Sequence, residues 1–389
     1  MYSDEDLNSA VAAGALSADA ASALRAHVSA QREMPSGDEE NFRLVNSFND
    51  IFVSIAIVIM LVAASAIGTA LAGLIAPVGE FDFSTDPAAM DGIMAASQRN
   101  GAWDRLLSGL LIAATAWPLA EAFTRRRRMA LPSIILLLAF VGGVFSAAFG
   151  LGTLFPTDEN VTAASIMISL AGLVAAGAAY LHWKRFMVPI TVAAGVAALT
   201  VTVLGLLVAA LEAAGAGEPE NILLWLVFAA GLAIFALAMR WDISDRERVT
   251  RRSDVAFWLH LLAAPMIAHP IFYSLGILGN SEDVGIGSAL AVVAIYVLFG
   301  IVAVLIDRRA LLVSALAYVL AALAFLFDRF GAVELTFALT ALVIGSALLT
   351  LSAFWTPLRS RLLALLPADW QARVPPPGAV KAMPRVAEA

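Results

Sequence analysis

Ten apolar segments, each close to the length of a membrane-spanning helix, constrain the fold of this chain more than any other feature. The hydrocarbon core of a bilayer is about 30 Å thick, and a helix needs about 20 apolar residues to cross it. Hydrophobic residues make up 61% of the chain and charged residues only 14%, unlike the balance in a soluble protein. We therefore expect an all-α integral membrane bundle. The segments are residues 51–75, 106–123, 130–155, 161–183, 187–211, 221–239, 256–278, 286–306, 310–327 and 335–355.

The positions of the basic residues predict how the bundle is oriented. Lys and Arg collect in the short loops that stay on the cytoplasmic side of a membrane. Of the 24 Lys and Arg residues, all but Arg99, Arg105 and Arg329 fall at alternate loops or at the ends of the chain. Both termini are therefore predicted to be cytoplasmic. The first apolar run follows an acidic, polar stretch, so no cleavable signal peptide is predicted.

The chain is predicted to have three regions, of which residues 46–357 form the transmembrane domain. Residues 1–45 precede it as a cytoplasmic helical segment. Residues 358–389 begin with "LRSRLLALLPADWQARV", whose leucines and arginines are typical of an interfacial helix, and end in a proline-rich tail that we expect to be disordered. The acidic loop 79–103 is predicted to carry a short amphipathic helix on the opposite membrane surface.

The N-terminal segment is predicted to form two short helices. Ser3 and Asp6 have capping-box spacing, Gly14 suits a helix C-cap, and Ser17 suits the start of a second helix. Their apolar stripe is too small for an independent core. The segment is therefore expected to pack on the membrane domain, bind a partner protein or self-associate, unless it is a weakly ordered tail.

This order of parts resembles that of multi-pass bacterial inner-membrane proteins without an assigned function. The shared layout is a short helical pair around "GALS", ten spans and a basic tail that ends in prolines. The resemblance covers the whole chain and implies residence in the bacterial inner (plasma) membrane. Ten helices with both termini inside also resembles the drug and metabolite transporter superfamily, although no sequence motif of that group is present.

The seventh span, "FWLHLLAAPMIAHPIF", places two histidines and two prolines within an apolar helix. His260 and His269 are nine residues apart, so in a straight helix their rings lie on opposite faces, about 13 Å apart along the axis. Pro265 and Pro270 lack an N–H group and are predicted to kink or locally unwind the helix.

The same prolines release the carbonyl groups of Leu261 and Met266 from the helical hydrogen-bond ladder. Unpaired backbone groups at membrane depth are tolerated only against protein or a water-filled cavity. The seventh span is therefore predicted to face the bundle interior. A substrate-binding site is predicted there, and the open alternative is a kinked helix whose histidines bond to neighbouring polar groups.

The second span contains a weak echo of the seventh. In "LLIAATAWPLAEAF", Trp117 and Pro118 stand about where His269 and Pro270 stand in "LLAAPMIAHPIF". Each is the second span of a five-span half, and two such halves would have opposite orientations, as in inverted-repeat transporters. Trp117 and Pro118 therefore join the predicted substrate-binding residues.

Signatures of catalysis are missing from the sequence. The chain has no cysteine, no phosphate-binding glycine loop and no zinc-protease or serine-hydrolase motif. Acidic residues fall near the predicted ends of the spans, so a proton-coupled carrier with a buried carboxylate relay is not predicted. The charge-alternating run 240–252 is interpreted as a solvated topological anchor and not as a nucleic-acid site.

Three classes of function remain open. The first is a transporter or channel-like permease of unknown substrate whose site lies near the seventh helix. The second is a non-catalytic assembly or sensory component of the membrane. The third is an intramembrane enzyme or haem protein that uses His260 or His269, with His182 as a further ligand. We predict no catalytic residues, metal site, cofactor or nucleic-acid partner, and a lipid bilayer as the surroundings.

Overall fold

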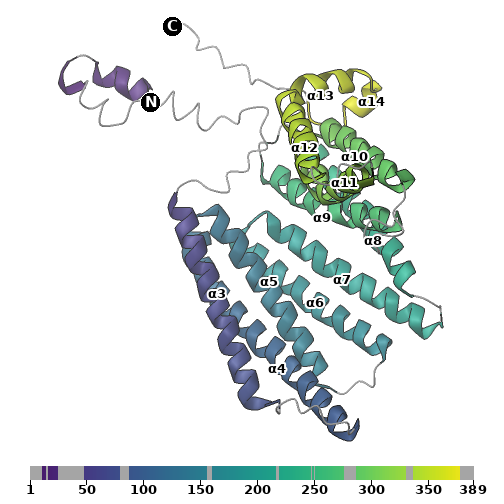
Figure 1. Ribbon diagram of the computed structural model, residues 1–389. Helices are drawn as coiled ribbons and strands as arrows, with labels where there is room; N and C mark the ends of the chain where they lie inside the picture. Colours follow the sequence, from purple (N-terminus) through teal and green to yellow (C-terminus); the bar gives the residue numbers. More distant parts are fainter. Residues whose placement is uncertain are drawn as a thin grey trace. The chain divides into compact units, whose positions relative to one another are not determined.

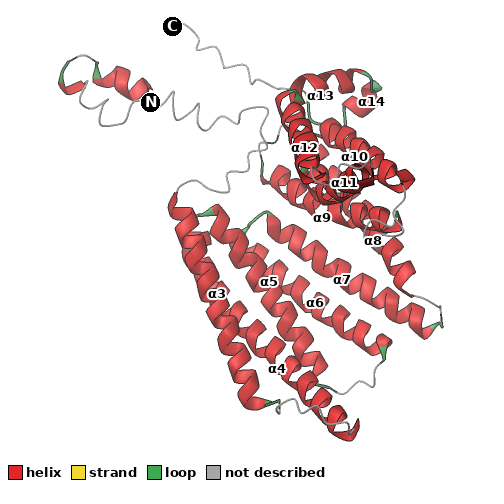
Figure 2. Cartoon of the chain, viewed as in Figure 1, coloured by secondary structure: helices red, strands yellow, loops and turns green. Residues whose placement is uncertain are grey.

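The computed structural model describes residues 11–14, 16–24, 48–78, 87–155, 160–215, 219–246, 248, 250–275, 286–329 and 336–376. All regular elements in these ranges are helices (Figures 1 and 2). The chain divides into two compact units. One comprises Met1–Phe42 with Gly378–Ala389, and the other comprises Arg43–Pro377.

Each of the ten predicted apolar segments coincides with a long helix of the second unit. By length and composition, eight described helices can cross a membrane, or nine if the two helices that meet at a 70° bend near residue 354 form one span. This is compatible with a multi-pass membrane protein. The helices are α3 (Phe48–Ile75), α4 (Pro87–Ala120), the π-helix η1 (Glu121–Arg126), α5 (Ala130–Thr153), α6 (Val161–Phe186), α7 (Ile190–Ala213), α8 (Pro219–Ser244), α9 (Arg251–Ser274), α10 (Ile286–Ile306), α11 (Ala310–Arg329), α12 (Thr336–Ala353), α13 (Trp355–Ala364) and α14 (Ala368–Gln371).

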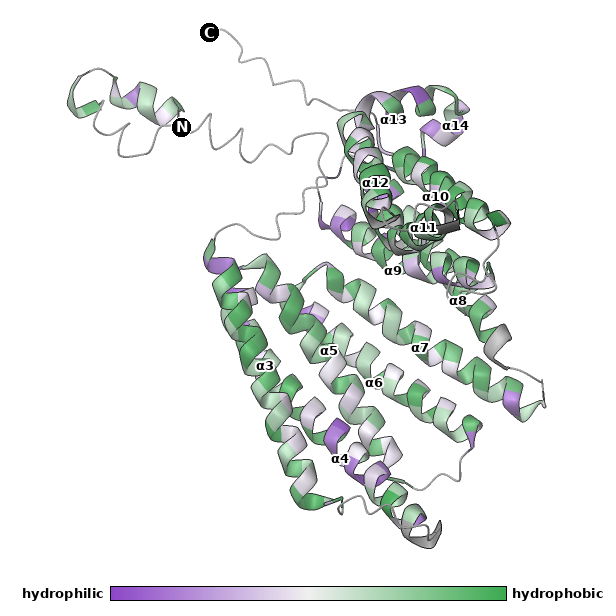
Figure 3. Ribbon diagram, viewed as in Figure 1, coloured by the Kyte–Doolittle hydropathy of each residue, from purple (hydrophilic) through white to green (hydrophobic). Residues whose placement is uncertain are grey.

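Hydrophobic residues occupy most positions along the helices (Figure 3). On α3, Ile55, Ile59 and Val62 are between 53% and 63% exposed. Water would not stabilise such a surface, whereas lipid tails would. The exposed apolar faces therefore suggest contact with a lipid bilayer.

Glycines let consecutive helices pack closely. A Cβ atom on Gly143 of α5 would lie 2.7 Å from the carbonyl oxygen of Gly109 on α4, and one on Gly109 would lie 2.5 Å from the carbonyl oxygen of Gly143. A Cβ on Gly172 of α6 would lie 2.9 Å from the carbonyl oxygen of Ala198 on α7. The backbones approach closely only because these positions lack side chains, as is common between membrane helices.

The predicted separate amphipathic helix in the loop before the second span is wrong. Residues 87–98 are instead the beginning of α4, which continues without a break to Ala120. The side-chain amide of Asn100 donates a 2.8 Å hydrogen bond to the carbonyl of Ala76, the residue after α3. The extension is thereby held against the preceding helix.

Helix α9, the predicted seventh span, is the most enclosed of the eight candidate spans. Of its most apolar stretch, 56% is buried, against 17–33% in the other seven. It packs against α7, α8 and α11. The prediction that this span faces the bundle interior is therefore confirmed.

The predicted unwinding of this helix is wrong, since α9 is one continuous helix from Arg251 to Ser274, and the alternative of a kink stays a prediction. Pro265 and Pro270 each remove one donor from the ladder, but the φ angle that proline prefers is close to that of a helix. Packing on three neighbouring helices favours the helical path on either side of each proline.

The first unit shows the predicted local signals where it is described. Gly14 has a φ of +70°, and its N–H group donates to the carbonyl of Val11, as expected for a glycine that ends a helix. The hydroxyl of Ser17 accepts a 3.1 Å hydrogen bond from the N–H group of Ala20 and so caps the second helix. The predicted cap at Ser3 and Asp6 lies outside the described residues.

Candidate functional site

A buried cluster of three ionisable side chains joins α8, α9 and the turn between α10 and α11. Nε2 of His260 lies 2.9 Å from Oδ2 of Asp242. Arg308 donates to both carboxylate oxygens of Asp242, through Nη2 to Oδ1 at 2.5 Å and through Nε to Oδ2 at 3.2 Å. His260 is 0% exposed, Asp242 1% and Arg308 2%. Such burial of charged groups is rare unless they are paired.

Local structure positions the three side chains. Asp242 lies in the last turn of α8, and α9 begins nine residues later at Arg251, where Thr250 caps it by accepting from the N–H group of Arg252. Asp245 holds that cap in place, since its Oδ2 accepts from both the N–H group and the hydroxyl of Thr250. The α8 to α9 connection is therefore short and well bonded.

The backbone conformation of Asp307 sets the direction of the Arg308 side chain. Asp307 has a φ of +58°, in the left-handed region that reverses the chain direction after α10. The reversal points Arg308 into the bundle, where its Nη2 also donates to the carbonyl of Ser253 at 3.1 Å, while Arg309 is left exposed. Of these two adjacent arginines, Arg308 is therefore buried and Arg309 is exposed.

The charges within the cluster balance. The guanidinium of Arg308 is always protonated, and its two-point bond requires Asp242 to be ionised. We assign His260 as a neutral imidazole that donates through Nε2. Its Nδ1 then has a lone pair, and within the described part of the chain this buried atom has no hydrogen-bond partner. The arrangement can accept a proton at Nδ1 next to an existing ion pair.

A second polar layer surrounds the turn after α10. Arg248 donates to Oδ2 of Asp307 at 2.9 Å and to the Asp307 carbonyl at 2.9 Å. The indole Nε1 of Trp355 donates to Oδ1 of Asp307 at 2.7 Å. The α8 to α9 connection, the α10 to α11 turn and the start of α13 are therefore held together at one end of the bundle.

The C-terminal segment adds to the same end. Arg246 donates to the carbonyl of Val374, and Arg359 donates to the carbonyls of Pro375 and Pro376. Val374 and Pro375 are buried. The prediction that the disordered tail begins at the first proline is therefore wrong for Pro375 and Pro376. Their carbonyl groups, and that of Val374, accept hydrogen bonds from two arginines of the bundle. The rest of that tail lies outside the described residues.

His269 lies in a different environment from His260. Its side chain is exposed, and its Nδ1 lies 2.7 Å from the hydroxyl of Tyr318 on α11. On the same helix Pro265 is exposed, Pro270 is buried, and Leu261 and Met266 are half-buried. The fold thus distributes the predicted residues of α9 over several faces of the helix.

Trp117 lies in a third environment. Its ring centroid lies 4.9 Å from that of Phe140, 5.2 Å from Phe186 and 6.2 Å from His182. His182 is 1% exposed, and its Nδ1 lies 3.4 Å from the hydroxyl of Thr191. Pro118, the neighbour of Trp117 on α4, is exposed. The structure therefore brings Trp117 to His182 and not to His269.

Asp242 and Arg308 are the residues that sequence reasoning missed. Both lie in charged stretches at the ends of apolar segments, where the sequence pattern predicts contact with water. One signal was available, because a buried histidine on a membrane helix needs a partner, and the nearest chain segment is the connection to the previous span. No group of three or more potential metal ligands occurs among the described residues.

Comparison with known protein families, with curated proteins and with solved structures found no match to the chain.

Proposed function

We propose that the chain is a multi-pass permease of the bacterial inner membrane, with ten spans, both termini cytoplasmic, and a transport pathway that follows α9. The observation that carries the proposal is the wholly buried His260, whose free Nδ1 adjoins the ion pair of Asp242 and Arg308. Ionisable residues inside membrane helices are costly and usually mark ion or substrate pathways. The many basic residues nearby assign the cluster to the cytoplasmic end of α9.

In this proposal the cluster is the inner gate of the pathway. Asp242 belongs to α8 and Arg308 to the turn before α11. Their bond therefore holds the end of α8 against the start of α11, the two helices that pack on either side of the pathway along α9 in this proposal. A proton taken up at Nδ1 of His260 adds a positive charge beside Arg308. The two cations then repel each other, which destabilises the closed arrangement of the gate. Proton uptake would thereby favour separation of α8 from the turn after α10.

The remaining predicted residues contribute unequally to this pathway. Leu261 and Met266 are half-buried, and Met266 packs against Gly231 of α8, so both belong to the proposed lining beyond His260. His269 and Pro265 are exposed. We place these two outside the pathway.

Proton flux into reconstituted vesicles tests the proposal. The purified chain is inserted into liposomes that contain a pH-sensitive dye, and a potassium gradient with valinomycin drives proton entry. We expect faster acidification than in empty liposomes, and return to the empty-liposome rate in His260→Phe. His182→Phe is the matched control, since His182 is equally buried but has no carboxylate partner among the described residues.

Equal acidification in protein-containing and empty liposomes would overturn the proposal that protons enter a pathway gated at His260. Equal loss of flux in His260→Phe and His182→Phe would do the same, because it would point to general damage and not to the cluster. Size-exclusion profiles of both variants, taken before reconstitution, show whether each is folded.

A second candidate function is that of an assembly or sensory component. It is favoured by the separate compact unit that contains Met1–Phe42, which is distinct from the apolar helices. If this unit mediates self-association, deletion of residues 2–40 lowers the molar mass measured by light scattering in detergent from that of an oligomer to that of a single chain. An unchanged mass removes support for self-association through this unit.

A further inference from the structure

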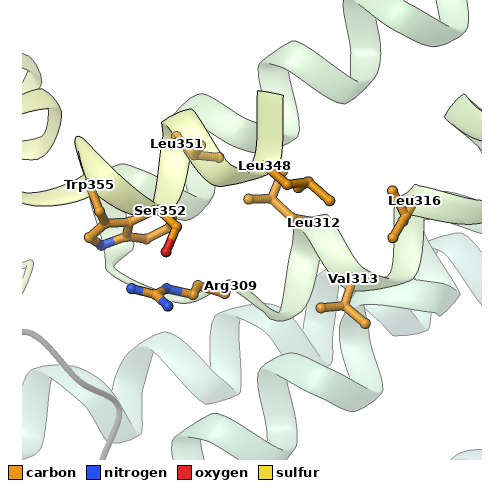
Figure 4. Close-up of a pocket in the computed structure, with 8 residues that line it drawn as sticks. All are labelled: Arg309, Leu312, Val313, Leu316, Leu348, Leu351, Ser352 and Trp355. Atoms are coloured by element: carbon orange, nitrogen blue, oxygen red, sulfur yellow. The ribbon is translucent and has the colours of Figure 1, made fainter. Parts of the chain in front are cut away.

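A pocket between α11 and α12 is lined by Arg309, the residue that follows Arg308 of the buried cluster. Its volume is about 160 Å³ (Figure 4). Leu312, Leu316, Leu348 and Leu351 form most of its wall, and Arg309 and Trp355 close one end. The wall is therefore apolar along its length and basic at one end.

The basic end presents an available positive charge. Arg309 is exposed, and its guanidinium carbon lies 4.8 Å from the centroid of the Trp355 ring. The nearest carboxylate in sequence, Asp307, is bound to Arg248 and to the indole of Trp355. Among the described residues Arg309 has no carboxylate partner, and stacking on an aromatic ring leaves its N–H groups able to bind an anion.

A hydroxyl group lies at the same end. Ser352 lines the pocket, and Figure 4 shows its oxygen directed toward the side of the pocket that Arg309 occupies. Ser352 is exposed. A guanidinium with a hydroxyl beside it is a suitable pair of donors for a phosphate group.

The apolar end faces the outside of the bundle. Val313, at the end away from Arg309, is 64% exposed, and Leu349 on α12 is 74% exposed. In a membrane such a surface meets lipid tails. A ligand in this pocket therefore has an apolar chain at one end and an anionic group at the other.

We propose that this pocket binds an anionic phospholipid, with the phosphate at Arg309 and Ser352 and one acyl chain along Leu312, Leu316 and Leu348. Charge complementarity favours this occupant, because basic pockets between membrane helices on the cytoplasmic side bind anionic lipid head groups. The proposal requires the membrane location of α11 and α12 but not transport. Since Trp355 bonds to Asp307, next to Arg308, a bound lipid would contact the same turn that carries the buried cluster.

Native mass spectrometry of the full chain in detergent tests the site. The probes are phosphatidylglycerol and phosphatidylcholine of equal chain length. We expect the wild type to prefer phosphatidylglycerol, and Arg309→Gln to lower its affinity roughly fivefold, the effect of one charge near a membrane surface. Arg361→Gln, an exposed arginine on α13, is the matched control and should leave the preference unchanged.

A second pair of variants tests the acyl-chain end. Leu348→Trp fills the pocket and should weaken binding of both lipids, whereas Leu342→Trp, at a position 67% exposed on the same helix, should not. Equal binding of both lipids by the wild type overturns the proposal, as does an equal effect of Arg309→Gln and Arg361→Gln. A dimer that Leu348→Trp dissociates would assign the pocket to a second copy of the chain and also overturn it.

Discussion

Arg308 and Asp242, 66 residues apart in the chain, form a two-point ion pair in which neither side chain is more than 2% exposed. The pair joins the end of α8 to the turn after α10, two elements that are distant in sequence. Burial of both charges carries a large desolvation cost, which the pair offsets only while both partners are present. Loss of one partner should therefore do more harm than loss of both.

A double-mutant cycle measures this dependence. Asp242→Asn leaves the buried Arg308 charge without its counterion, and Arg308→Gln leaves the Asp242 carboxylate without its own. Each single change should lower the free energy of unfolding by about 3–5 kcal/mol. The double variant should lose less than either single variant, because no buried charge is left without its partner, as followed by thermal unfolding of the detergent-solubilised chain.

The control for this cycle is the exposed neighbour Arg309, for which Arg309→Gln should change stability by no more than about 0.5 kcal/mol. Additive losses in the cycle would show that Asp242 and Arg308 are not coupled. A similar loss in Arg309→Gln would show that any charge removed from this turn is harmful.

Two adjacent glycines on α5 should respond oppositely to the same substitution. A Cβ on Gly143 would meet the backbone of Gly109, whereas nothing lies within 4 Å of a Cβ on Gly142. Gly143→Ala should destabilise the chain by about 1–3 kcal/mol, because α4 and α5 would have to separate. Gly142→Ala should be neutral or stabilising by up to about 1 kcal/mol, because alanine favours a helix. Equal melting temperatures for the two variants would exclude close packing at Gly143.

The sequence predicted the helices well because their signal is local. A span needs only about 20 consecutive apolar residues, and caps such as Gly14 and Ser17 act within four residues of themselves. The cluster of Asp242, His260 and Arg308 is not local. Its assembly depends on the packing of α8 against α9 and on the positive φ of Asp307, which no periodic pattern encodes.

Pro265 and Pro270 illustrate a different limit. Each rule about proline in a helix is local, and together they predicted local unwinding of α9. Packing against three other helices is a tertiary effect that outweighed the loss of two hydrogen bonds. The arginines were misjudged for a similar reason, since "RR" at residues 308 and 309 is uniform in sequence while one member is buried and the other exposed.

The orientation predicted from basic residues can be tested with reporter fusions. A reporter placed after Arg128 should be cytoplasmic, because four consecutive arginines precede it. A reporter placed after Pro219 should be external, because the preceding loop is acidic. Alkaline phosphatase activity reports the external location and green fluorescence the cytoplasmic one. Phosphatase activity after Arg128, or fluorescence after Pro219, would contradict the topology.

The contact between His269 and Tyr318 predicts that His269 is a structural residue. The imidazole Nδ1 lies 2.7 Å from the Tyr318 hydroxyl, and the pair connects the C-terminal part of α9 to α11. Polar contacts between membrane helices stabilise by about 0.6 kcal/mol on average and by up to about 2 kcal/mol. His269→Phe and Tyr318→Phe should each lower the free energy of unfolding by that amount, and the double variant should lose little more than either one.

Proton flux separates this structural role from a functional one. Because His269 is exposed and outside the proposed pathway, His269→Phe should retain the wild-type rate of vesicle acidification, while His260→Phe loses it. The two histidines lie on the same helix, but His260 is buried beside Asp242 and His269 is exposed beside Tyr318. Abolished flux in His269→Phe, with unfolding unchanged, would show that His269 lines the pathway and that the cluster around His260 does not define it alone.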